Sequence, residues 1–357
     1  MNRNAMIAMS GGVDSSVAAY LMKERGFDCI GTTMKLFSNE DVGIDRDDVC
    51  CSLKDTEDAR AVAYRLGIPH YVFNFSADFI DRVIRRFVEA YENGRTPNPC
   101  IDCNRYIKFD RLFSRARELE YAFVVTGHYA RIERDAAGRF LLKKALDDAK
   151  DQSYFLYSMT QEQLAHTLFP LGEIRKKDVR EIALAQGFIN AKKHESQDVC
   201  FVSNGDYANF IEHYTGKRYA PGNFIDVNGN VLGRHKGLIR YTIGQRKGLG
   251  LSFSRPMYVR EKNVVDNTVT LGDDNLLYSK TLFADDLNWI APPPSPVVRV
   301  KAKTRYRQPE QEATVWIEND GIRVEFDEPQ RALAAGQAVV LYDGDVVVGG
   351  GTIIGAA

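Results

Sequence analysis

The chain has 357 residues, of which 44% are hydrophobic and 27% charged, with a formal net charge of −1. That length exceeds what one ordinary core holds, so two or three globular domains are expected. No segment approaches the roughly 18 consecutive apolar residues of a membrane span, and the N-terminus lacks the apolar run of a secretory signal. We therefore expect a cytoplasmic protein with no membrane partner and with reduced cysteines. The balanced charge means that any polyanion must be bound by local basic patches.

Short apolar runs alternate with helical patterns from Ala5 to about Val202. The runs begin at residues 5, 29, 70 and 122, and the helical patterns span 15–23, 55–66, 79–91 and 105–119. Gly26 and Gly67 stand where the first two helices should stop. This alternation predicts an α/β fold with a doubly wound parallel sheet.

Strand patterns dominate the rest of the chain. Turn signals at Asn228-Gly229 and Asp266-Asn267 predict a small, mostly β central domain. A stiff proline segment at 291–296 then precedes apolar runs that predict a closed antiparallel barrel. The expected domains are 1–203, 204–280 and 281–357.

A dense glycine and serine motif, Ser10 to Ser16, lies between the first strand and the first helix. Glycines allow a close approach to phosphate, and the hydroxyls and the helix N-terminus supply oriented donors, so the motif predicts an anion cradle. It lacks the lysine of P-loop nucleotide hydrolases. It resembles the "SGGxDS" loop of the N-type ATP pyrophosphatases, which implies ATP as a substrate, and Asp14 would suit Mg²⁺.

Two of the six cysteines, Cys100 and Cys103, form a C-x-x-C pair. A zinc site would need a second half-site, and neither another C-x-x-C nor a matching histidine pair occurs. A redox pair or a nucleophile stays open. Cys103 precedes a helical pattern and lies near Arg105 and Lys108, features that lower a thiol pKa and favour the thiolate. Cys50 and Cys51 are interpreted as a turn and helix start, and Cys29 as a core residue.

Further motifs extend from the loop to the C-terminal part of the chain. They are "RTPNPCIDCNRYIKF", "TGHYAR", "KDQSYFLY", "ESQDVCFV", "HKGLIRYTIGQRKGLG" and "KTRYRQ". In this order they resemble the bacterial tRNA-specific 2-thiouridylase family, from about Met6 to Gly355. The resemblance implies ATP-dependent transfer of sulfur to carbon 2 of the wobble uridine in tRNAs for Lys, Glu and Gln. It also implies a persulfide-carrying protein as sulfur donor and the C-terminal barrel as a tRNA-binding domain.

The resemblance assigns roles to individual residues. Cys200 would carry the persulfide, and Cys103 would be the nucleophile that forms a transient disulfide with it. The residues expected at ATP are Ala8, Met9, Ser10, Gly11, Gly12, Val13, Asp14, Ser15, Ser16, Met34 and Gly127. Those expected at tRNA or its target base are Asn98, Pro99, Cys100, His128, Lys150, Asp151, Gln152, Arg305, Tyr306 and Gln337.

Cys100 departs from the aspartate expected there in many relatives. Three thiols, Cys100, Cys103 and Cys200, could instead hold an iron–sulfur cluster with an open iron position, so a cluster-dependent route is an alternative to the persulfide route.

Basic residues recur at 299, 301, 303, 305 and 307. On a strand this period of two would send all five side chains to one face, where tRNA phosphates would bind.

Two other functions are compatible with parts of the sequence. An amide-forming ATP pyrophosphatase would explain the loop but not Cys103, Cys200 or the basic stretch. An RNA-binding protein with a vestigial loop would leave the intact cradle without a purpose.

Overall fold

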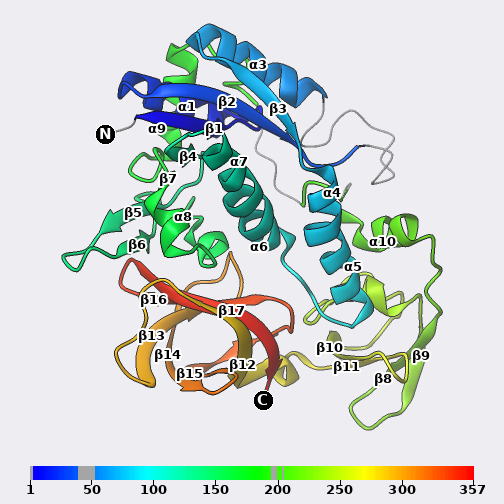
Figure 1. Ribbon diagram of the computed structural model, residues 1–357. Helices are drawn as coiled ribbons and strands as arrows, with labels where there is room; N and C mark the ends of the chain where they lie inside the picture. Colours follow the sequence, from blue (N-terminus) through cyan, green and yellow to red (C-terminus); the bar gives the residue numbers. More distant parts are fainter. Residues whose placement is uncertain (1–2, 39–52, 194–198, 203–204) are drawn as a thin grey trace. The chain divides into compact units, whose positions relative to one another are not determined.

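A five-stranded parallel sheet forms the centre of the first of two compact units (Figure 1). The computed structural model describes residues 3–38, 53–193, 199–202 and 205–357. The first unit contains Met1–Val83, Cys100–Gly205 and Asp345–Val347. Its sheet has the order β3-β2-β1-β4-β7. These strands span His70–Asn74, Asp28–Lys35, Asn4–Ala8, Phe123–Val125 and Thr167–Leu168.

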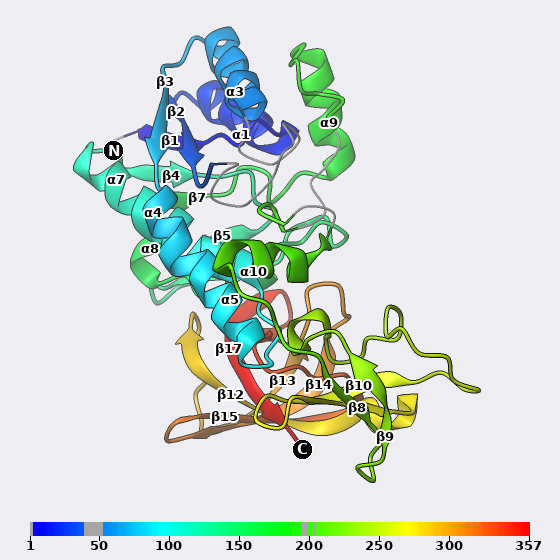
Figure 2. The same cartoon turned by 90° about the vertical axis from the view of Figure 1, so that its right-hand side faces the viewer.

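Helices cover both faces of this sheet, as Figure 2 shows. Buried residues of α1 (Val13–Glu24), α3 (Leu53–Leu66) and α9 (Lys176–Ala185) pack together on one face. Leu112, Phe113 and Ala116 of α7 (Leu112–Glu118) pack against the other. The predicted doubly wound α/β fold is therefore confirmed. Gly26 and Gly67 follow their helices with φ of 75° and 65°, a conformation that favours glycine.

A long helical stretch precedes α7 and is not regular. It begins with α6 (Pro99–Asp102) and continues as a π-helix, η2 (Cys103–Arg111). A second irregular stretch joins α4 (Ser76–Phe79) to a π-helix, η1 (Ile80–Ile84). Pi-helical turns are rare and occur frequently at functional sites. The sequence predicted these helices but not their widened turns.

An antiparallel hairpin completes the first unit. It consists of β5 (Arg131–Arg134) and β6 (Phe140–Lys143). The distant segment Asp345–Val347 joins it: Val346 pairs with Lys143, and the Asp345 carboxylate lies 2.7 Å from Arg131 and 3.2 Å from Lys143. Neither this hairpin nor its late partner was predicted.

The second unit contains Ile84–Pro99, Asp206–Gly344 and Val348–Ala357. In it α5 (Arg85–Glu92) packs aromatic rings against α10 (Tyr207–Thr215). A four-stranded sheet follows, with order β10-β11-β8-β9. These strands span Tyr258–Asn263, Thr268–Gly272, Gly222–Ile225 and Val231–His235.

A closed barrel completes the second unit, with order β12-β15-β14-β13-β16-β17 and a closing β12–β17 pairing (Figure 1). Its strands span Tyr278–Trp289, Gly321–Arg331, Gln311–Glu318, Val297–Lys303, Ala338–Asp343 and Val346–Ala356. Alternate side chains fill the interior, including Val300, Val315, Val324 and Leu341. The predicted C-terminal antiparallel barrel is confirmed. Within the described residues, no helix is long and apolar enough to cross a membrane.

Candidate active site

The glycine and serine loop joins β1 to α1, as its sequence predicts. Gly11 has φ of 72°, and Gly12 is the N-cap of α1 without a side-chain cap hydrogen bond. The hydroxyls of Ser15 and Ser16 each donate to the Gly12 carbonyl at 3.0 Å. Ser15 also accepts a hydrogen bond from the Ser10 N–H at 3.2 Å. The first N–H groups of α1 are thus left for an external acceptor, which suits an anion.

Gly127 and Met34 lie at the same edge of the sheet as this loop. Gly127 follows β4, and a Cβ there would lie 2.8 Å from the backbone of Asp14 and Ser15. Only a glycine permits this approach to the start of α1. Met34 stands near the end of β2, half-buried against the core on the α7 face. Their predicted contact with the nucleotide base and ribose stays a prediction.

A buried lysine that the sequence did not single out lies against Asp14. Lys176, the first residue of α9, places Nζ 2.6 and 2.7 Å from the two carboxylate oxygens of Asp14. Its relative exposure is 7%. Tyr129 donates its hydroxyl to the same carboxylate at 2.9 Å. The cradle lacks a lysine of its own, and Lys176 brings one to the start of α1 from a distant part of the chain.

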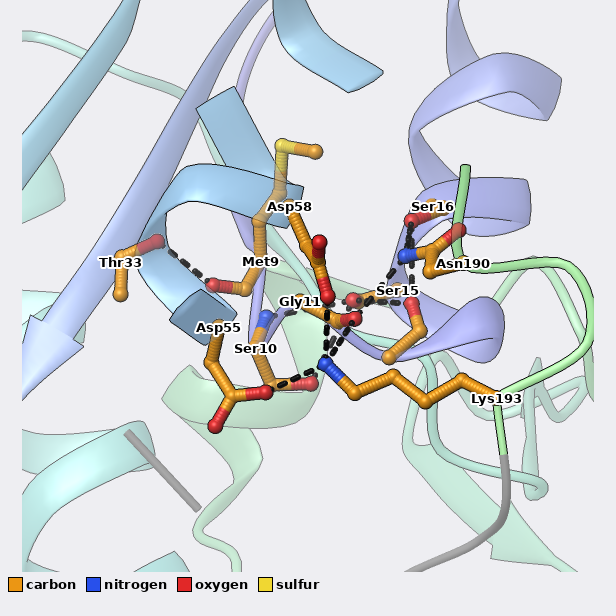
Figure 3. A network of polar contacts seen from close by, with 11 residues as sticks. Met9, Ser10, Gly11, Ser15, Ser16, Thr33, Asp55, Asp58, Asn190 and Lys193 are labelled. Carbon is orange, nitrogen blue, oxygen red and sulfur yellow. Dashed lines mark hydrogen bonds and ion pairs between the residues drawn. The ribbon is translucent and has the colours of Figure 1, made fainter. Parts of the chain in front are cut away.

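A second lysine, Lys193, holds the other side of the loop (Figure 3). Its Nζ lies 2.5 Å from Asp55, 2.6 Å from Asp58 and 3.3 Å from the Gly11 carbonyl. Burial alone would lower its pKa, but the hydrogen bonds to the two carboxylates outweigh burial and raise the pKa above its ordinary value. Asn190 donates to both the Gly11 carbonyl and the Ser16 hydroxyl at 2.9 Å. These residues too were missed, because nothing in their local sequence indicates proximity to the loop.

Cys103 begins the π-helical segment η2 and is half-buried. Burial raises its pKa, Lys108 acts in the opposite direction, and Asp102 adds to the rise. The expectation of a lowered pKa is therefore wrong for this structure. The helix was expected to begin at Arg105 but begins at Pro99, so Cys103 lies one turn inside it, where the dipole is weaker. Burial likewise raises the pKa of Cys100 to about 11, even though part of that residue reaches solvent.

Cys200 lies in the same unit and is half-buried. Its neighbour Phe201 packs edge-on against Phe79 of α4 at 5.7 Å, and α4 contacts η2, which Cys103 begins. Among the described residues, no group of three or more Cys, His, Asp and Glu is arranged to hold a metal. Cys100, Cys103 and Cys200 are all described, so in this arrangement they do not form the ligand set of a cluster. Cys29 is buried as expected, and Cys50 and Cys51 lie outside the described residues.

His128 and the segment 150–152 lie beside Tyr129. His128 receives a contact from Lys108 Nζ to Nε2 at 3.4 Å, and its Nδ1 is 2.7 Å from the Thr126 hydroxyl. A lysine only donates, so Nε2 is the acceptor and Nδ1 carries the proton. Burial, with Lys108 adding to it, lowers the pKa of His128 well below its ordinary value. The ring is therefore neutral at pH 7.

Asp151 and Gln152 have structural partners. Asp151 is buried just before the 3₁₀ turn Ser153–Leu156 and accepts hydrogen bonds from the Ser153 N–H at 3.2 Å and from the Ser153 hydroxyl at 2.8 Å. Gln152 accepts from the Tyr129 N–H at 3.0 Å. Through Tyr129 this segment is linked to Asp14. Lys150 is half-buried just before it.

The chain is similar to known proteins along nearly its whole length. Residues 3–204 match the family described as "tRNA methyl transferase HUP domain", 208–273 the "tRNA methyl transferase PRC-barrel domain", and 279–353 the "Aminomethyltransferase beta-barrel domain". The tRNA-specific 2-thiouridylase MnmA of Clostridioides difficile is 51% identical over 99% of this chain and 98% of its own length. The chain belongs to the tRNA-specific 2-thiouridylase family. The relatives of the same name from Symbiobacterium thermophilum and Lachnoclostridium phytofermentans are 50% and 48% identical, covering 98% and 99% of this chain and 92% and 99% of their own lengths.

The remaining residues that the resemblance to this family assigns to tRNA lie in the second unit. Gln337 donates to the carbonyls of Thr96 and Pro97 at 2.8 and 3.3 Å, so it supports the backbone that leads into Asn98 and Pro99. Arg305 donates to the carbonyls of Ile243 and Ala332 at 3.4 and 3.0 Å. Tyr306 follows it in the same turn, with the Lys303 ammonium 5.9 Å from its ring centroid.

The single basic face predicted for 299–307 is wrong in two respects. Strand β13 ends at Lys303, so Arg305 and Arg307 lie in a turn and do not continue its alternation. Other strands of the barrel also supply acids. Asp327 of β15 binds Arg299 through two bonds of 2.8 and 2.9 Å, and Glu312 of β14 lies 3.6 Å from Lys301. The run of like charges in the sequence is therefore partly neutralised by cross-strand partners.

Proposed function

We propose that the protein is a tRNA sulfurtransferase that makes 2-thiouridine in the cytoplasm, using ATP and a cysteine persulfide. The observation that carries this proposal is identity near 50% along the whole chain to proteins named tRNA-specific 2-thiouridylase. The cradle between β1 and α1 supports it, because an ATP pyrophosphatase must hold a pyrophosphate group. The proposed domains are the catalytic region 1–203, a central domain 204–280 and a tRNA-binding barrel 281–357.

The first step activates the base. The carbonyl oxygen at carbon 2 of uridine attacks the α-phosphorus of ATP, pyrophosphate leaves, and the oxygen becomes part of an adenylate. The N–H groups and hydroxyls of residues 10–16 would hold the leaving pyrophosphate, and the Lys176 ammonium would offset its growing charge. This step converts an oxygen that cannot leave into an AMP that can.

The second step brings sulfur. Cys200 would carry a persulfide, and Cys103 would attack the Cys200 sulfur, forming a disulfide and expelling hydrosulfide. The hydrosulfide adds to carbon 2, and AMP departs. Alternatively the terminal sulfur adds first and Cys103 then cleaves the bridge. Either route ends with 2-thiouridine and a Cys103–Cys200 disulfide, which a dithiol reductant must reduce before another turnover.

Magnesium fits the residues at the cradle. The Asp14 carboxylate and the serine hydroxyls are the hard oxygen donors that Mg²⁺ prefers, and an ATP-bound ion needs only one or two protein carboxylates. When bound, the ion would neutralise phosphate charge. The three cysteines are not arranged as a ligand set, so the proposal has no step through an iron–sulfur cluster.

The target base must leave the anticodon stack to reach such a site. We propose that Asn98, Pro99 and Cys100 contact the extruded wobble uridine of tRNAs for Lys, Glu and Gln, with Gln337 supporting the loop. His128, Lys150, Asp151, Gln152, Arg305 and Tyr306 would contact or shape the surface for the tRNA. A persulfide-carrying donor protein would load Cys200.

One assay tests the proposal. The protein is incubated anaerobically with ATP, Mg²⁺, a persulfide donor, a reductant and an anticodon stem-loop RNA, and the digested RNA is analysed by mass spectrometry. We expect 2-thiouridine with AMP and pyrophosphate in equal amounts, and no 2-thiouridine from Cys200→Ala or Cys103→Ala. A methylated base, or AMP without thiolated RNA from the wild type, would refute it. Full activity only in iron-loaded protein would favour the cluster route.

A further inference from the structure

Two adjacent glycines give the phosphate loop a peptide that can rotate. Gly11 has φ of 72°, and Gly12 has φ of −89° and ψ of 161°. A side chain at Gly11 is excluded, because its Cβ would lie 2.3 Å from the Asp55 carbonyl oxygen. Neither glycine has a side chain that would limit rotation of the peptide between them, so its orientation must be set by other contacts.

The carbonyl of this peptide is held from outside the loop. Asn190 Nδ2 donates to the Gly11 oxygen at 2.9 Å and Lys193 Nζ at 3.3 Å (Figure 3). By contrast, the next carbonyl, of Gly12, is held from within α1 by the Ser15 and Ser16 hydroxyls and the Ser16 N–H. The loop thus has one carbonyl fixed by its own helix and one fixed by residues 190–193.

The orientation of a carbonyl fixes the orientation of the following N–H. In a trans peptide the two groups point in opposite directions, and the part of the chain that the structure describes contains no cis peptide bonds. With the Gly11 oxygen held by Asn190 and Lys193, the Gly12 N–H points away from them. A rotated peptide would instead present an oxygen there, and an oxygen repels phosphate.

We propose that Asn190 and Lys193 are positioning residues that hold the Gly11–Gly12 peptide with the Gly12 N–H directed at the pyrophosphate group of ATP. This inference rests on the proposed function. Asp55 and Asp58 hold Lys193 in place through bonds of 2.5 and 2.6 Å, with side chains only 12% and 14% exposed. The ion cluster therefore sets the geometry of a backbone donor and does not itself touch the phosphate.

The Asn190 side chain offers a clean substitution. It is 3% exposed, and its Oδ1 has no hydrogen-bond partner among the described residues. Asn190→Leu keeps the branched shape and the number of heavy atoms of the side chain and removes this unsatisfied acceptor, which offsets part of the loss of the two donated bonds. Lys193→Met removes the other donor independently. Lys193→Arg keeps the charge, and Lys192→Met, at the exposed neighbouring position, is the matched control.

The test measures binding of magnesium pyrophosphate and of a non-hydrolysable ATP analogue by calorimetry. Loss of one hydrogen bond to a charged group weakens binding about tenfold to hundredfold. We expect that loss in Asn190→Leu and Lys193→Met, wild-type binding in Lys192→Met, and recovery of most of the affinity in Lys193→Arg. Because the two variants remove separate bonds, either one carries the test if the other does not fold.

A spectroscopic measurement separates positioning from general damage. In protein labelled with ¹⁵N-glycine, pyrophosphate should shift the amide resonance of Gly12, assigned through Gly12→Ala. We expect that shift in the wild type and Lys192→Met, and its loss in the two positioning variants while other glycine resonances stay unchanged. Unchanged affinity and an unchanged Gly12 shift in the variants would overturn the inference. A wild type that binds neither ligand would instead overturn the proposed function.

Discussion

Replacing Lys176 by methionine tests whether this lysine supplies the positive charge for the loop at residues 10–16, which has no lysine of its own. The side chain is 9% exposed and meets both oxygens of Asp14, whose side chain is 31% exposed. Methionine fills a similar volume without a charge. The change therefore leaves a half-buried carboxylate and the start of α1 without their nearest ammonium group.

The magnitude follows from this partial burial. Breaking a fully buried ion pair costs about 3–5 kcal/mol, and hydrogen bonds to charged groups contribute about 1.5–3 kcal/mol. Because water reaches part of Asp14, we expect a loss of about 2 kcal/mol in the free energy of unfolding. A domain with a typical stability of about 5–15 kcal/mol stays folded after that loss. The adenylation rate should fall much further, by about 10²- to 10³-fold, as when one donor to a developing oxyanion is removed.

The assay follows pyrophosphate release in a single turnover with RNA and ATP, alongside urea unfolding. Lys177→Met is the matched control, since its side chain is adjacent but 83% exposed. Lys176→Arg should retain part of the rate. Adenylation by Lys176→Met at the rate of the Lys177→Met control would refute the role of Lys176 at the leaving group.

Three further predictions concern thiols, pH and salt. Burial raises the pKa of Cys103, so the rate of its alkylation by iodoacetamide should rise by up to about tenfold per pH unit above neutrality. Lys108→Met should slow this alkylation, because Lys108 lowers the thiol pKa. An alkylation rate that levels off below pH 7 would contradict the raised pKa. His235 is 1% exposed, accepts at Nδ1 and donates to Asn267, and burial lowers its pKa. As the pH falls, His235 is therefore protonated in the unfolded chain before it is protonated in the folded chain. We expect its full contribution to the free energy of unfolding above pH 6.5, and a loss of up to about 1.4 kcal/mol per pH unit below that value. A His235→Gln variant with the same pH profile would exclude this residue. Arg307 is exposed beyond β13 whereas Arg299 is paired with Asp327, so Arg307→Ala should reduce the salt slope of tRNA binding by about one and Arg299→Ala by less; equal slopes would show that cross-strand pairing does not matter.

The features of the active site that depend on residues close together in the sequence could be predicted. Ser10 to Ser16 lie between an apolar run and a helical pattern, and strand-loop-helix order fixes their place at the end of β1. The positions of Met34 and Gly127 near that end follow from the same parallel topology. Short-range periodicity and turn chemistry are sufficient for such features.

The long-range part could not be predicted. Lys176 and Lys193 reach the loop across more than 130 residues of sequence, and surface lysines with the same local pattern are common. The prediction of a lowered pKa for Cys103 was wrong because the burial of this thiol depends on the packing of the whole unit. The prediction of a single basic face at 299–307 was wrong because Asp327 and Glu312, which neutralise part of the stretch, come from other strands.

The late segment Asp345–Val347 has a consequence for biosynthesis. The hairpin of β5 and β6 gains an ion-pair partner and a paired strand from it. A ribosome adds about 5–20 residues per second, so roughly 200 further residues take about 10–40 seconds to emerge after the hairpin is made. During that interval Arg131 and Lys143 cannot form their ion pairs with Asp345. The hairpin of the nascent first unit therefore stays without this strand and ion-pair partner until residues 345–347 have been made, and a stop codon before them would remove both contacts.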